Sequence, residues 1–422
     1  MWVHLAALAA LLLVPLSPAR AQAPSAAPAT LTLDDAFARV AHFHPDLRMF
    51  GARSDALFAE REAAGLGPPL RAGMEVENVL GSGDASGFGQ AELTLTLAGV
   101  FERGGKLDAR RTLAQSRIDA LAVQREARRL DLLAEVARRH LEALGARADA
   151  SIAQRDIEQR QRTVAAARKR LQAGASPESV VLAAQAALAR AQMTLARASQ
   201  RQTAARQHLA ALWGERNPRF ELAAGDPLAL PEIESLDALA TLLEASPELL
   251  QIADERRILE ARVRLARSAG TPDLDWQVGA RRMQDSGDFS LVGSVSLPLG
   301  SERRARPQIR AAEAELAALE IERESRDIAL YSTLAQAHGL YRVAQLEVQR
   351  TGDDILPWLV RAEQAAERAY RAGAISYLEW AQLQSERIAA QRQQLDAALD
   401  AQRALIELQR LTGASLLAGT AP

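Results

Sequence analysis

The chain contains two copies of one sequence unit, at an offset of about two hundred residues. The segment LTLDDAFARVAHFHPDLRMF, from Leu31, returns as ESLDALATLLEASPELLQIA, from Glu234, and RLQAGASPESVV returns as AYRAGAISYLEW. The matching segments begin, in order, at Leu31 and Glu234, at Glu102 and Glu302, and at Arg170 and Ala369. Three similarities in one order and at nearly one offset predict a duplicated fold, in which both copies build the same elements.

The first residues predict a secretory signal peptide. The apolar run from Leu5 to Leu16 is too short to span a bilayer, and the pattern Ala19-Arg20-Ala21 after it suits signal peptidase. No later stretch supplies a transmembrane helix, so we expect export without one. A Pro- and Gly-rich linker at 214–232 separates the copies. The predicted divisions are residues 1–21 (signal peptide), 22–225 (first repeat) and 226–422 (second repeat).

Each copy contains two stretches that alternate apolar and polar side chains, which predicts β-strands. They lie near residues 71–80, 90–100, 273–282 and 289–299. Strands of about ten residues with one apolar and one polar face are typical of a tilted membrane strand. Leu95 and Val295 are therefore predicted to face lipid, and their neighbours Thr94 and Ser294 to face a lumen.

Four strands cannot close a membrane barrel, whose smallest known forms have ~8 strands. Three chains that pool their strands would reach twelve, which predicts a trimer. The alternative that the pattern leaves open is a pair of exposed hairpins on a soluble protein.

The remaining parts of both copies predict very long helices. The stretch from Gly104 to Ala173 has no proline, and ~70 helical residues extend ~105 Å. The second copy has a similar stretch from Gln308 to Ala372, with a kink predicted at Pro357. Helices of this length bury their apolar faces only in a bundle or a coiled-coil wall. The predicted fold is mainly α with a membrane β-barrel part, in two repeats that each have long helices and two strands.

Composition and motifs exclude several kinds of chemistry. The chain has no cysteine, so it has no disulfide, no thiolate site and no lipid-modified cysteine, and its 51 basic and 53 acidic residues form no basic stripe for nucleic acid. His42 and His44 suggest a metal pair, but a spacing of two on the expected helix points them to different faces. With no catalytic motif either, we predict no enzyme, no cofactor and no metal site.

The chain resembles the outer-membrane efflux protein family, the TolC-like channels, over essentially its whole mature length. The duplication, the strand pairs between helices and the turn RAGAISYLEWAQLQ carry this resemblance. The stretch LTLAGVFERGGKLDAR is similar to the heavy-metal (cobalt-zinc-cadmium type) efflux branch, whose strand-to-helix signature fits four residues. These are Glu102, Gly104, Gly105 and Lys106. The second copy reads Glu302-Arg303-Arg304-Ala305-Arg306 and lacks the glycines.

The resemblance implies an outer-membrane channel that extends into the periplasm of a Gram-negative cell. It implies a homotrimer whose twelve-stranded barrel, set in outer-membrane lipid, is continued by an α-helical barrel. The helix tips would then meet a periplasmic membrane-fusion adaptor, which meets an inner-membrane pump. The tip residues are Gly174, Ala175, Ser176, Gly373, Ala374 and Ser376. A periplasmic gate falls on Glu379, with Gln382 at the second, normally acidic, position.

The expected function is therefore the exit duct of a tripartite export pump, with RND-type heavy-metal cation efflux favoured on the resemblance alone. A multidrug or type I secretion channel stays open as an alternative, because a wide tube selects little and the pump chooses the cargo. A periplasmic coiled-coil adaptor or scaffold would also have long hairpins, but it would not need four amphipathic strands.

Overall fold

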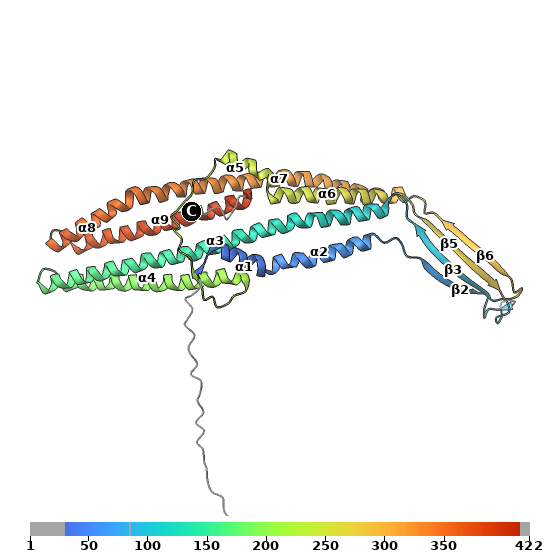
Figure 1. Ribbon diagram of the computed structural model, residues 1–422, viewed down its shortest axis with the longest axis horizontal. Helices are drawn as coiled ribbons and strands as arrows, with labels where there is room; N and C mark the ends of the chain where they lie inside the picture. Colours follow the sequence, from blue (N-terminus) through green and yellow to red (C-terminus); the bar gives the residue numbers. More distant parts are fainter. Residues whose placement is uncertain (1–29, 84–85, 414–422) are drawn as a thin grey trace, which may run out of the picture.

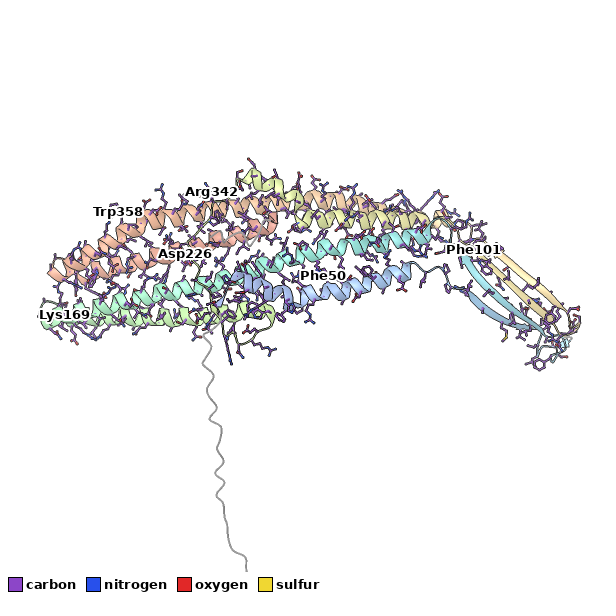
Figure 2. All side chains as sticks on the ribbon, in the orientation of Figure 1. Phe50, Phe101, Lys169, Asp226, Arg342 and Trp358 are labelled. Atoms are coloured by element: carbon purple, nitrogen blue, oxygen red, sulfur yellow. The ribbon has the colours of Figure 1, made fainter. Side chains whose placement is uncertain are left out.

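A computed structural model describes residues 30–83 and 86–413. The molecule is elongated, with a long helical part that carries a four-stranded sheet at one end (Figure 1). Figure 2 places Lys169 at the end far from the sheet and Phe101 at the junction of helices and sheet. The predicted signal peptide and its cleavage site lie outside the described residues.

Both copies run through the same order of elements, as the duplication predicts. The first copy contains β1 (Thr30–Leu31), α1 (Leu33–Phe43), α2 (Pro45–Ala64), β2 (Arg71–Glu77), β3 (Glu92–Phe101), α3 (Lys106–Gln172) and α4 (Glu178–Ala210). The second contains β4 (Glu221–Leu222), α5 (Leu236–Leu242), α6 (Pro247–Ser268), β5 (Leu274–Met283), β6 (Phe289–Ser296), α7 (Ser301–Arg350), α8 (Leu356–Ala372) and α9 (Tyr377–Thr412). Short 3₁₀ turns follow α4 and α5.

The longest helix, α3, spans 67 residues without interruption, which corresponds to ~100 Å. It packs against α4 in the half of the molecule that carries the tips, and against α2 and α6 in the half near the sheet (Figure 1). The predicted length of this helix is confirmed. Among the described residues, no helix is both long and apolar enough to cross a membrane.

The second long helical stretch is broken close to the predicted kink. A π-helical turn, η4 (Thr351–Ile355), separates α7 from α8, and Pro357 lies in the first turn of α8. The start predicted at Gln308 is wrong, because α7 begins at Ser301 and continues through Pro307. A proline near the beginning of a 50-residue helix removes one backbone hydrogen bond, and the rest of the helix outweighs that loss.

The main core lies where the two copies meet, midway along the helical part. Buried side chains of α1, α3, α4 and α9 form one cluster, which includes Phe37, Val136, Leu209, Leu399 and Ile406. Near it, β1 and β4 pair in parallel and link the first segment of the chain to the connection between the copies. Alanine is the most frequent of the buried hydrophobic residues, which lets these long helices pack closely.

Candidate channel wall, strand junction and helix tips

The four longer strands form one antiparallel sheet in the order β2-β3-β5-β6. Pairing of β3 with β5 joins the hairpins of the two copies, and the observed strands match the predicted stretches to within a few residues. Strands β2 and β6 are the outer strands, and neither has a second strand partner in the described part of the chain. A single chain therefore presents two open edges.

One face of this sheet is apolar. The register places Leu95 beside Met74 and Ala280, and Val295 beside Trp276, so that the predicted apolar positions of all four strands share a face. Leu291 is 91% exposed, which is far outside the range of a soluble core residue. Within the described strands, Arg282 is the one charged residue on this face.

The opposite face is polar and carries a compact charged group. Arg281 donates to Glu92 at 2.8 Å and to Thr94 Oγ1 at 3.0 Å, and it lies 3.1 Å from Glu77. Three neighbouring strands thus contribute to one cluster, which lies at the end of the sheet far from the helices. Thr94 is only 2% exposed, because Arg281 and the sheet cover it.

The predicted strand-to-helix signature forms a compact junction. Arg110 donates to both carboxylate oxygens of Glu102, at 2.5 and 2.7 Å, and to the carbonyl of Leu66 after α2. Lys106 forms an ion pair of 2.7 Å with Asp273, just before β5. The hydrogen bonds from Arg110 hold the pKa of Glu102 below its usual range. The signature residues therefore tie the end of β3 and the start of α3 to the segments around them.

Both glycines of the signature adopt left-handed backbone conformations. Gly104 has φ of +73°, and a β-carbon there would lie 2.6 Å from Thr271, while Gly105 has φ of +71° and open space around it. The second copy lacks glycines after Glu302, but Gly300 takes the left-handed conformation directly before α7. The duplicated unit therefore keeps the glycine turn and moves it to the other side of the acidic residue.

The two tips end in the same backbone motif. The amide of Ala175 bonds to the carbonyl of Arg170, and the amide of Ala374 bonds to that of Ala369, both at 2.9 Å. These are Schellman motifs, and they require the left-handed conformation that Gly174 (φ +69°) and Gly373 (φ +83°) adopt. The helix stop predicted at both glycines is confirmed, and these glycines and the alanines after them are exposed.

The two tips are also tied to each other. Arg170, in the last turn of α3, donates to the carbonyl of Tyr370 in α8 and to that of Ala175 in its own turn. Its guanidinium lies 4.9 Å from the centre of the Tyr370 ring, at a distance typical of a cation–π contact. Of the two predicted tip serines, Ser176 is half-buried, whereas Ser376 is exposed and caps α9.

The predicted gate residues lie at the start of α9. Glu379 accepts hydrogen bonds of 2.8 Å from the backbone amide and the hydroxyl of Ser376, which completes a capping box. These bonds hold the pKa of Glu379 below its usual range. Gln382 donates to Glu386 at 3.0 Å, and both predicted gate residues are exposed. A ring of three Glu379 carboxylates needs three chains and stays a prediction.

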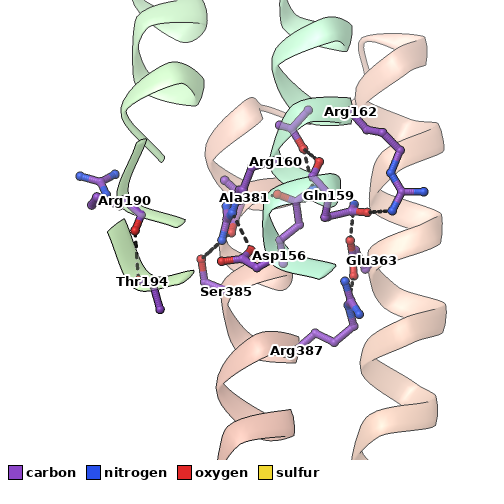
Figure 3. Close-up of polar contacts among 12 residues, drawn as sticks. Asp156, Gln159, Arg160, Arg162, Arg190, Thr194, Glu363, Ala381, Ser385 and Arg387 are labelled. Carbon is purple, nitrogen blue, oxygen red and sulfur yellow. Dashed lines mark hydrogen bonds and ion pairs between the residues drawn. The ribbon is translucent and has the colours of Figure 1, made fainter. Parts of the chain in front are cut away.

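A buried polar cluster of α3, α8 and α9 links the two copies (Figure 3). Glu363 of α8 accepts a hydrogen bond of 2.6 Å from Gln159 of α3, and it forms an ion pair with Arg387 of α9. Next to it, Arg160 donates to Gln384 at 3.2 Å and to Ser385 at 3.0 Å. Each buried charge has partners, so breaking one pair leaves a charge without compensation.

Among residues 30–83 and 86–413, no three His, Asp or Glu side chains gather in a way that could hold a metal ion. The placement of His44 within a helix is wrong, because His44 lies between α1 and α2 and accepts from the amide of Asp46. His140 is buried with Nε2 unpartnered, and burial lowers its pKa, which disfavours the charged form.

Sequence reasoning missed Arg281, Arg170 and the Glu363 cluster. Arg281 bonds to Thr94, Arg170 to Tyr370 and Glu363 to Gln159, and these partners lie 187 to 204 positions away along the chain. Such distances are beyond the reach of any local pattern. One signal was available at the second tip, where Tyr370, Tyr377 and Trp380 gather in a chain with only 4% aromatic residues.

Curated relatives cover the chain only in part. Over 175 residues it is 30% identical to the cobalt-zinc-cadmium resistance protein CzcC of Cupriavidus metallidurans, which is 42% of each chain. It is 28% identical over 318 residues to protein CyaE of Bordetella pertussis, which is 72% of this chain and 62% of that one. The chain thus spans less than two thirds of the length of either relative.

The fold and the sequence profile agree on the family. The structure of CusC, which was described together with the conformational changes that accompany folding and transmembrane channel formation, matches with a TM-score of 0.76 at 18% identity, over 92% of this chain and 94% of that one. The profile described as outer membrane efflux protein matches residues 29–215 and 238–414. This is a family of efflux channels and not of enzymes, as predicted. The chain belongs to the outer membrane efflux protein family.

Proposed function

We propose that this chain is the outer-membrane exit duct of a tripartite export pump, and that three copies form one channel. The observation that carries the proposal is a four-stranded sheet with an exposed apolar face and two open edges. Pairing of β2 with β6 of the next copy would remove every open edge and close a twelve-stranded barrel. The polar face would then line the lumen.

The ends of the apolar face support its place in a membrane. Phe101 and Trp276 stack at the end near the helices, with ring centres 5.7 Å apart. Phe289 lies at the other end, 73% exposed. Aromatic residues at both borders of an apolar band are typical of outer-membrane barrels, because their rings suit the headgroup region.

Oligomer and channel formation provide the direct test. Protein extracted from outer membranes should run as a heat-modifiable trimer and should conduct ions in planar bilayers. A monomer in the soluble fraction would contradict the proposal and favour a periplasmic scaffold.

We propose heavy-metal cations as the cargo, with support from the similarity to a protein named for cobalt, zinc and cadmium resistance. A strain that lacks the gene should become sensitive to these metals. Sensitivity to drugs alone, with unchanged metal tolerance, would favour the multidrug alternative.

The helix tips are proposed to bind the periplasmic adaptor. Their exposed Gly-Ala turns lie at the end of the molecule far from the sheet (Figure 1). Gly373→Val should abolish export while trimer remains in the membrane, because valine strains a φ of +83° and fills the turn surface. Gly51→Val is a matched control, since nothing lies within 4 Å of its added β-carbon. Unchanged metal resistance of a strain that carries Gly373→Val would argue against the tips as the adaptor-binding surface.

A further inference from the structure

The charges on the polar face of the sheet are unevenly distributed. At the end near the helices, Arg71 and Asp275 bear opposite charges. At the outer end, which is the end far from the helices, the polar face bears three carboxylates and one guanidinium. These are Glu75, Glu77, Glu92 and Arg281. The outer end is therefore net negative, and Arg281 is the residue that limits this negative charge.

Arg281 is held in place by its neighbours and still reaches the surface of the face. Its contacts come from two strands, with Glu77 on β2 and with Glu92 and Thr94 on β3. The side chains of Arg281 and Glu92 keep 32% and 23% of their surface exposed. The charge therefore has a defined position on the wall and acts on ions in the adjacent water.

The next residue along β5 provides a natural comparison. Arg282 has the same side chain, but the alternation of the strand places it on the apolar face. Its guanidinium lies 5.7 Å from the ring of Phe289 at the outer border of that face. A long cationic side chain at the border of an apolar band extends toward the headgroups.

We infer that Arg281 sets the ion selectivity of the outer mouth of the channel. The inference rests on the proposed barrel, in which the polar face lines the lumen. Three copies of the cluster then form a ring at one level, where the carboxylates attract cations and the arginines reduce that attraction. Screening limits the effect to a few ångström at ~1 M salt, while at ~0.01 M salt it reaches ~30 Å.

The test compares substitutions at the two neighbouring arginines in planar bilayers under a KCl gradient at low salt. Arg281→Gln should raise the permeability ratio of cation to anion by at least about twofold, because it leaves the carboxylates of Glu77 and Glu92 without their arginine partner. Arg281→Lys should restore the wild-type ratio, and Arg282→Gln should leave it unchanged. The Arg281→Gln effect should largely vanish at ~1 M KCl. An unchanged ratio with Arg281→Gln, or an equal shift with Arg282→Gln, would overturn the inference.

A second variant keeps the inference testable if Arg281→Gln does not assemble. Glu77→Gln removes one carboxylate and leaves Arg281 its contacts with Glu92 and Thr94, so it should lower the same ratio. A trimer with this substitution and a wild-type ratio would overturn the inference. Failure of the wild-type protein to conduct would instead count against the proposed duct, so the two failures are distinguishable.

Discussion

An arginine substitution should lower the free energy of unfolding by different amounts on the two faces of the sheet. On the apolar face the loss should depend on how deep in the bilayer the substituted position lies. Leu97 pairs with Ala72 and Val278 on the apolar face, midway between the rows of Leu93 and Phe101. In the proposed barrel an arginine there lies at the middle of the bilayer. Ser294 is exposed on the polar face, where it pairs with Gln277, and an arginine there meets water.

The register gives the expected magnitudes. Phe101 lies eight positions after Leu93, and at ~3.3 Å per residue with a tilt of ~40° this stretch forms an apolar band ~20 Å tall. Leu97→Arg lies ~10 Å from both borders and should cost ~2–4 kcal/mol per protomer. Val295 pairs with Trp276, one row from Phe101, so Val295→Arg should cost only ~0–1 kcal/mol. The costs at Leu95 should be intermediate.

The assay is the amount of heat-modifiable trimer in outer membranes, followed by urea unfolding of purified protein in lipid vesicles. Ser294→Arg is the control and should leave both unchanged. Thr94 is not a suitable control, although alternation places it on the same face, because it is buried and bonded to Arg281. Equal losses with Leu97→Arg and Ser294→Arg, or a larger loss with Val295→Arg than with Leu97→Arg, would refute the barrel assignment.

Three further predictions concern the helical part. Gly104→Ala should sharply reduce the amount of folded trimer, because the added β-carbon would lie 2.6 Å from Thr271. Gly105→Ala should lower the free energy of unfolding, measured with urea, by only ~1–2 kcal/mol of backbone strain. Glu363→Ala should lower the free energy of unfolding by ~3–5 kcal/mol, because Arg387, whose side chain is only 15% exposed, loses its partner. Glu367→Ala should lower it by less than ~1 kcal/mol, because its partner Arg371 is exposed to solvent. Glu379→Gln should relieve block by multivalent cations in bilayers. The pKa of Glu379 is lowered from its ordinary value of 4.5, so its ionised side chain stabilises the tip above pH 4.5. This stabilisation is lost as the pH falls through the lowered pKa of the folded state. Glu379→Gln should therefore also flatten the acid dependence of tip unfolding.

Local patterns in the sequence determined the elements of this protein and their faces. Alternation with a period of two fixed which side of β3 bears Leu95, and the absence of proline between Gly104 and Ala173 fixed the length of α3. Both are properties of neighbouring residues, so they can be read without knowing the fold. The duplication and the glycines at the tips are also local signals, and they predicted the equivalent turns at Gly174 and Gly373.

Only the tertiary structure decided which charges meet. Arg281 and Arg282 are neighbours with the same side chain, yet one joins carboxylates from two other strands and the other lies over an aromatic ring. Pairing of β3 with β5 creates this difference, because it brings together residues 189 positions apart. The bond from Arg170 to Tyr370 depends likewise on two helices ending at the same level. Such contacts follow from how segments far apart in the sequence come to lie side by side.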